Sequence, residues 1–442
     1  MEATLKSAQS RAEAGLALPP GPRMPRALQT AIWSRRAQWL LEQSRARFGP
    51  TFSLKIADED WVLVSEPEAI KRVFTGDPHV FHAGEGNSLL GPILGESSLL
   101  VLDEERHLSQ RKLLLPPFHG ERMQAYGETM ASIAVREIES WPSGTALRLR
   151  PRMQAIALEI IIETVFGVHG ARVDELRRAL RDYLDLTGNP RFLAPVVLLG
   201  PARIGLIPAF RRRIERVDAL LSELVAKRRA APDLERREDV LSMLLCARHE
   251  DGSPMSEAQV RDQLLTLLVA GHETTATALS WAMERLVRTP DELARLRREV
   301  ATGDEAYLTA TVQETLRLRP VLVLVLRRLT EPVEIAGHRL PAGTSVAPCI
   351  HLVHRDPAIY PEPDRFLPER FLAEPPGTYT WIPFGGGIRR CLGASFAQFE
   401  MQIVLRELVR RREARPADPA PERPYRRAIT ETPRRDAEVV LS

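Results

Sequence analysis

The sequence predicts a mainly α-helical fold with a small β part, an α+β architecture in which one long central helix crosses the molecule. Helical periodicity dominates residues 67–320, one helical segment is far longer than usual, and strand-like patterns occupy only two short regions. The chain has 442 residues, 44% of them hydrophobic and 27% charged, which is typical of a globular protein.

The N-terminal region begins with residues 1–17, a polar stretch that we expect to be a disordered tail. Residues 18–25 (LPPGPRMP) predict a stiff lead-in, followed by a helix to about Phe48. TFSLKI and WVLVSE then alternate like two strands separated by the polar ADED. No long linker or internal repeat follows, so residues 18–442 are predicted to form a single domain.

The long helix is predicted from SEAQVRDQLLTLLVAGHETTATALSWAMERLVR, in which Ser256 is the N-cap, Gln259 completes a capping box and Pro290 supplies the stop. Its length of roughly 30 residues far exceeds the usual ~11 to 12, so its middle should line a site. A second helix, from about Leu308 to Arg319, leads into a β-rich run over residues 321–348.

Charge and cysteine usage exclude several classes of protein. The 61 basic and 58 acidic residues leave a net charge of only +3, which argues against a nucleic-acid partner. No apolar stretch reaches the ~18 residues of a membrane span, and the first residues lack a signal-peptide pattern, so we expect a cytoplasmic protein. Cys246 and Cys349 stand in apolar surroundings typical of buried thiols, whereas Cys391 follows a glycine-rich turn.

The segment around Cys391, PFGGGIRRCLGASFAQFE, contains glycines that suggest a close approach to the backbone. A lone cysteine there could be a nucleophile, a redox sensor or a metal ligand. A tight glycine turn and a following helix N-terminus both favour its thiolate. Six positions within ten residues form F-G-x-G-x-R-x-C-x-G: Phe384, Gly385, Gly387, Arg389, Cys391 and Gly393.

This pattern resembles the haem-binding loop of the cytochrome P450 family, and further motifs of that family occur in order along nearly the whole chain. The resemblance implies haem b as the cofactor, with Cys391 as the axial ligand of its iron. It also implies that Arg389 binds a haem propionate, that Phe384 covers the sulfur, and that Gly385 lets the porphyrin lie against the chain.

The middle of the long helix reads AGHETT, in which Ala270 and Thr274 share a face. Taken alone, small residues at this point could equally form a notch for helix packing. The resemblance implies that Ala270 makes room for O2, that Thr274 donates a hydrogen bond, and that Glu273 relays protons.

Two further sets of residues match the family. Glu314 and Arg317 are three apart in QETLRLRP and, with Arg370 in PERF, are expected to form a buried network that braces the cysteine loop. His107 and Arg111 are four apart on one helix face.

The resemblance implies that His107 and Arg111 bind propionate together with Arg327 and Arg389. The alternative for the first two is a solvated basic helix face.

His351 and His354 could suggest a metal site, but the sequence offers no further ligand at zinc spacing, so a core or surface role is favoured. No flavin or nicotinamide motif is present, so electrons are expected from a separate ferredoxin with its reductase. Arginines in and after the cysteine loop, with Lys112, could form a basic docking patch, although a merely solvated helix is the alternative.

The apolar run VLVLVL is expected to line the substrate side through Val321, Leu322, Val323 and Leu324, together with Ala270. The resemblance therefore implies a monooxygenase that inserts one oxygen atom of O2 into a C–H bond of a hydrophobic small molecule, such as a fatty acid, terpenoid, steroid or polyketide. The alternatives are a peroxide-driven hydroxylase and a non-catalytic haem protein that binds a ligand.

Overall fold

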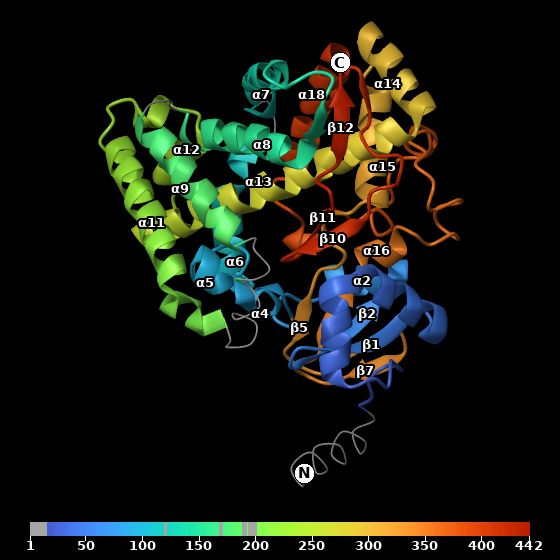
Figure 1. Ribbon diagram of the computed structural model, residues 1–442. Coiled ribbons are helices and arrows are strands. Elements are labelled where there is room, and N and C mark those ends of the chain that lie inside the picture. Colours follow the sequence, from blue (N-terminus) through green and yellow to red (C-terminus); the bar gives the residue numbers. More distant parts are fainter. Residues whose placement is uncertain (1–15, 119–121, 168–170, 188–191, 193–200) are drawn as a thin grey trace.

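The computed structural model describes residues 16–118, 122–167, 171–187, 192 and 201–442, so nearly all of the expected N-terminal tail lies outside the described residues. The mainly α-helical architecture with a small β part is confirmed (Figure 1). The central helix α13 runs through the middle of the helical part, and the largest sheet lies with α2 at one end of the molecule.

The helices carry the labels of Figure 1. They are α2 (Arg26–Phe48), α3 (Pro67–Phe74), α4 (Ala83–Gly86), α5 (Gly91–Leu94), α6 (Glu104–Leu114), α7 (Arg122–Glu139), α8 (Leu149–Phe166), α9 (Ala171–Thr187), α11 (Pro208–Arg229), α12 (Val240–Cys246), α13 (Glu257–Arg288), α14 (Pro290–Thr302), α15 (Ala306–Leu318), α16 (Ile350–Val353), α17 (Arg370–Ala373) and α18 (Ala394–Arg411). Short 3₁₀ turns include η5 (Gly387–Arg389).

The strands form four small sheets. They are β1 (Thr51–Ile56), β2 (Glu59–Val64), β3 (Phe81–His82), β4 (Ala146–Arg148), β5 (Arg327–Leu329), β6 (Val333–Ile335), β7 (His338–Leu340), β8 (Ser345–Pro348), β9 (Ala414–Pro416), β10 (Pro424–Arg427), β11 (Thr430–Pro433) and β12 (Glu438–Leu441). The largest sheet has the order β1-β2-β8-β5-β3, in which only the β2–β8 pair is parallel. The others are β10-β11, β4-β12-β9 and β6-β7.

The prediction for α13 is confirmed at both ends. The Ser256 hydroxyl accepts the Gln259 backbone N–H at 3.2 Å, and the Gln259 side chain accepts the Ser256 N–H at 2.8 Å. The helix runs for 32 residues and ends just before Pro290, which begins α14. Such a capping box satisfies two backbone donors that a helix start otherwise leaves unpaired.

Two strand predictions need correction. The turn between the first strands is only two residues long, because Glu59 pairs with Ile56 and Asp60 with Lys55, so half of the expected ADED linker belongs to β2. The run from 321 to 326 precedes β5 and is not a strand. Its backbone bonds instead go to separate segments, from Glu431 N–H to the Val321 carbonyl and from Val325 N–H to that of Pro348.

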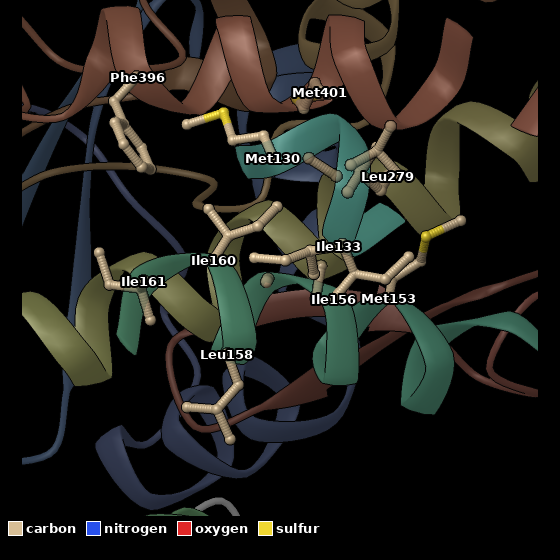
Figure 2. Close-up of a cluster of buried hydrophobic side chains, with 14 of the residues drawn as sticks. Met130, Ile133, Met153, Ile156, Leu158, Ile160, Ile161, Leu279, Phe396 and Met401 are labelled. Carbon is tan, nitrogen blue, oxygen red and sulfur yellow. The ribbon is translucent and has the colours of Figure 1, made fainter. Parts of the chain in front are cut away.

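The main hydrophobic core lies where α7, α8, α13 and α18 meet (Figure 2). Met130 and Ile133 of α7, Ile156 of α8, Leu279 of α13 and Met401 of α18 are all buried there. This packing fixes α13 and α18 relative to one another, which matters because α13 carries Ala270, Glu273 and Thr274 and α18 directly follows the cysteine loop. Within the described residues, none of the helices combines the length and the apolar character needed to cross a membrane.

Candidate functional site

The turn before Cys391 brings the chain very close to the end of α3. Gly387 adopts a φ of +62°, and a Cβ there would lie 1.9 Å from the Phe74 carbonyl oxygen. Only glycine fits this position. The turn is closed by the Cys391 N–H, which donates to the Phe384 carbonyl at 2.9 Å, and α18 begins at Ala394.

Cys391 is an exposed residue, although protein atoms surround its sulfur closely enough to desolvate the thiol. Burial raises its pKa above the usual 9.0, while the Gly393 N–H, Arg111 and Arg390 act in the opposite direction. The Gly393 N–H thus favours the thiolate, as expected of this turn, but burial outweighs it. A metal ion would have to displace the proton, as thiol ligands generally require.

Three arginines and one histidine from separate segments gather beside this loop: His107 and Arg111 on α6, Arg327 on β5 and Arg389 on η5. Burial, together with the charges of Arg389, Arg111 and Arg327, lowers the pKa of His107 to about 3, so its ring is neutral at neutral pH. Burial likewise lowers the pKa values of Arg327 and Arg389 to about 10. The three guanidinium groups thus repel one another in a poorly solvated region.

Arg389 has a partner that sequence reasoning missed. It forms an ion pair with Asp103, which also accepts the N–H groups of Gly84 and Glu85 at 2.8 and 2.9 Å. Among the described residues, this is the one carboxylate that forms an ion pair with any of the three arginines. Its position four residues before His107 was the only available signal.

The middle of α13 exposes Ala270, although most of the surrounding helix is buried. The Thr274 hydroxyl donates to the Ala270 carbonyl at 2.7 Å and lies on the same face. Gly271 instead faces α8, since a Cβ there would lie 3.3 Å from the Ile161 side chain. The packing notch considered from the sequence therefore accounts for Gly271.

Glu273 points toward the start of α8. Arg150 Nη1 donates to its Oε1 at 3.2 Å, and the Gln154 amide donates to its Oε2 at 2.5 Å. Burial raises the pKa of Glu273, while Arg150, Gln154 and Arg427 lower it. The acid is therefore held by two donors in a desolvated position next to Thr274.

Glu314, Arg317 and Arg370 lie together. Arg317 Nε and Nη2 donate to the two Glu314 carboxylate oxygens at 2.6 and 2.8 Å, with both side chains fully buried. Arg370 Nε donates to Glu314 at 3.2 Å. Arg317 also donates to the carbonyls of His354 and Pro363, both at 2.8 Å.

His354 connects this network to the cysteine loop, a role that sequence reasoning did not assign. Its Nδ1 bonds the Arg317 carbonyl at 3.1 Å, and its Nε2 accepts the Ile382 N–H at 2.8 Å. Desolvation lowers its pKa well below 6.5 and keeps the ring neutral. His351 is also engaged, with Glu42 and Arg355, and the described residues contain no cluster of three potential metal ligands.

Comparison with known proteins identifies the family. The sequence profile of "Cytochrome P450" matches residues 18–436. Cytochrome P450 135B1 of Mycobacterium tuberculosis is 45% identical over 434 residues, covering 96% of this chain and 91% of that one. Cytochrome P450 135A1 of the same species is 39% identical, covering 96% and 95%. The chain belongs to the cytochrome P450 family.

Solved cytochromes P450 share the fold. A cyanobacterial CYP120A1 bound to retinoic acid aligns with a TM-score of 0.85 at 26% identity, covering 97% of this chain and 99% of that chain. The haem domain of cytochrome P450DA aligns at 0.82 and 22% identity, covering 97% and 98%. The chain is accordingly a haem-iron monooxygenase of the oxidoreductase class.

The residues present fit the haem of a cytochrome P450. The buried Nδ1 of His107 has no hydrogen-bond partner among the described residues, and the three arginines share a single carboxylate there. A haem would supply two further carboxylates, which suit this excess of positive charge. Gly385 adds space on the same loop, since a Cβ there would approach nothing nearer than Val325 at 3.9 Å.

The apolar segment after Pro320 is divided between different surroundings. Val321 packs with the main core, Leu322 with the sheet, and Val323 and Leu324 with α2 and β1. The structure therefore does not gather all four on one surface with Ala270. A surface groove of about 300 Å³ between α11 and α13 lies elsewhere and contains none of these residues.

The arginines near the cysteine loop are largely paired. Arg406 bonds Glu305 at 2.6 Å, Arg411 pairs with Glu407, and Lys112 bonds Glu250 at 2.5 Å. Arg390, next to Cys391, is exposed. The basic patch expected from the sequence is therefore smaller than the number of arginines suggests.

Proposed function

We propose that this cytochrome P450 inserts one oxygen atom of O2 into a C–H bond of a hydrophobic small molecule. The second oxygen atom leaves as water, with two electrons and two protons consumed. The observation that carries the proposal is the meeting of Cys391 with three mutually repelling arginines and the neutral His107 in one desolvated region. We further propose that residues 18–442 form one domain, which the family match over 18–436 supports.

The proposed cofactor is haem b, which activates O2 when it is bound. Cys391 would ligate its iron as the thiolate, and His107, Arg111, Arg327 and Arg389 would hold its propionates. Arg389 would remain tied to Asp103, so the propionate site would be fixed to the segment between α5 and α6. Phe384 would cover the loop beside the sulfur, where its ring packs 6.0 Å from that of Trp381.

Proton handling is assigned to α13. Ala270 leaves space on the exposed face, and Thr274 would turn its hydroxyl from the Ala270 carbonyl toward the reacting oxygen. Glu273 would deliver protons, since its raised pKa brings the carboxyl closer to neutral pH, where a proton donor is most effective. Glu314, Arg317 and Arg370 would brace the cysteine loop through His354 and touch no substrate.

The proposed substrate is apolar, in the range of fatty acids, terpenoids, steroids and polyketides. The exposed Ala270 supports this class, and so does the retinoic acid bound to the cyanobacterial CYP120A1. Electrons would come from a separate ferredoxin with its reductase. The exposed Arg390 and the 41% exposed Ile388 next to Cys391 are a candidate contact for that donor.

Cysteine ligation is tested optically. The reduced protein with carbon monoxide should show the red-shifted Soret band of a thiolate complex, and Cys391→Ser should lose it. Cys349→Ser is the control, because Cys349 is buried at the end of β8, away from the loop. A normal band in the Cys391 variant would refute the ligand.

The reaction is tested with a surrogate ferredoxin system and a panel of apolar compounds. Compounds that displace water from the ferric iron should stimulate NADPH consumption and yield a hydroxylated product. Thr274→Ala should retain haem but divert electrons to peroxide. Tight coupling in that variant would contradict the role of Thr274, and efficient turnover with peroxide alone would favour the peroxide-driven alternative.

A further inference from the structure

One arginine at the start of α8 serves two carboxylates from different parts of the chain. Arg150 Nε donates to Asp436 Oδ1 at 2.6 Å, and its Nη1 donates to Glu273 Oε1 at 3.2 Å. Asp436 lies between β11 and β12, 163 residues after Glu273, so the α13 motif does not predict that the two residues share an arginine. The Asp436 side chain is 13% exposed and that of Glu273 26% exposed.

Asp436 holds Arg150 more firmly than Glu273 does. Its contact is the shorter of the two, and its backbone carbonyl also accepts the Arg150 N–H at 3.0 Å. Asp436 adopts a φ of +59°, which fixes this turn in the left-handed region. The carboxylate therefore stays beside the guanidinium whatever Glu273 does.

Because Arg150 is shared between two carboxylates, each carboxylate receives less electrostatic stabilisation from its charge. The negative charge of Asp436 offsets much of the field of Arg150 at Glu273, because the charges are close and poorly solvated. Burial raises the pKa of Glu273 against these donors, and the charge of Asp436 would act in the same direction as burial. The other groups facing Glu273 are Gln154 on α8 and Arg427 on β10, and Arg427 Nη2 is itself 3.5 Å from Asp436.

We propose that Asp436 is a positioning residue for the proton-delivering carboxyl of α13: by holding Arg150, it weakens the positive charge that the guanidinium presents to Glu273. The inference rests on the proposed function, because a protonated Glu273 matters only if this residue delivers protons during the reaction. His272, the neighbour of Glu273, does not supply the effect, because desolvation lowers its pKa to about 4 and keeps it neutral.

The test follows the carboxyl of Glu273 itself. Infrared spectra of the haem-loaded protein across pH 4–9 would give the titration midpoint of its C=O band, assigned by its loss in Glu273→Gln. Asp436→Asn should move the midpoint to lower pH by about one unit, because Glu273 then receives the full charge of Arg150. Asparagine tolerates the left-handed backbone and can still accept from Arg150, so the fold should be kept.

A second variant should shift the titration midpoint of Glu273 in the opposite direction. Arg427→Gln removes a cation that faces both carboxylates, so the midpoint should move to higher pH. Asp418→Asn is the matched control for Asp436→Asn. It also removes one negative charge, but Asp418 pairs with Arg435 and does not contact Glu273. It should leave the midpoint in place.

Coupling measurements separate this inference from the proposed function. In Asp436→Asn, the pH above which electrons are lost to peroxide should fall with the infrared midpoint. An unchanged midpoint in Asp436→Asn, or equal movement in Asp418→Asn, would overturn the inference while leaving the role of Glu273 intact. If Glu273→Gln couples as tightly as the native protein, the relay itself fails, whatever the midpoint does.

Discussion

Glu431 on β11 is a buried acid whose removal should stabilise the protein in a pH-dependent way. The residue is 5% exposed, and its Oε1 has no hydrogen-bond partner among the described residues. It is held in place by its backbone, since its N–H donates to the Val321 carbonyl and its own carbonyl accepts Trp281 Nε1–H at 2.9 Å. Glu431→Gln would remove the charge and keep the size of the side chain.

Burial raises the pKa of Glu431 from 4.5 to about 7, although Arg426 opposes the change. The pKa of Glu431 thus differs by about 2.5 units between the folded and unfolded states. At roughly 1.4 kcal/mol per unit, ionising this group lowers the free energy of unfolding by about 3 kcal/mol. Above pH 7 the full cost is present. As the pH falls from 7 to 4.5, the folded form takes up the proton first and the cost disappears.

Urea unfolding at pH 8 and pH 5 measures the effect. The glutamine variant should gain about 3 kcal/mol at pH 8 and no more than about 1 kcal/mol at pH 5, with unchanged slopes. Glu334→Gln on β6 is the control, because Glu334 is exposed and should give no gain at either pH. An equal gain at both pH values would refute the reasoning, since it would point to packing instead of charge.

Two further predictions concern the cysteine loop and its brace. Gly387→Ala should lower stability by more than about 2 kcal/mol and reduce haem content, because its Cβ would collide with the Phe74 carbonyl. Gly91→Ala on α5 is the control, because a Cβ there would meet nothing within 4 Å, and similar losses in both variants would contradict this. Arg317→Lys should cost about 3–5 kcal/mol in urea unfolding, because five hydrogen bonds of a fully buried guanidinium are disturbed. Arg370→Lys should cost about 1 kcal/mol, since one 3.2 Å bond joins it to Glu314, and the reverse order would refute the ranking.

Local signals in the sequence predicted the elements that depend on near neighbours. The capping box of α13 works through residues three apart, so its start could be read directly. The segment 321–326 is an unbroken apolar, β-branched-rich run typical of a buried strand, yet Val321 and Val325 bond two unrelated partners, Glu431 and Pro348. Periodicity cannot reveal such pairing, because it depends on where distant chain segments come to lie.

The candidate site shows the same division. The cysteine-loop motif predicted which residues gather near Cys391, but it could not predict the pairing of Asp103 with Arg389, of Arg150 with Asp436 or of His354 with Ile382, whose partners are 286, 286 and 28 residues apart. Their roles exist only once the fold has formed. The sequence also could not assign Gly271 to α8, because Ile161 lies 110 residues earlier in the chain.

The close contact between the glycine turn and Phe74 links two segments that are more than 300 residues apart. At Gly387 the neighbour is backbone, which has no rotamer with which to move aside. In a chimaera that exchanges parts between relatives, the end of α3 and the cysteine loop should therefore be transferred from the same parent. A crossover that separates them would need the two backbones to agree to within a fraction of an ångström.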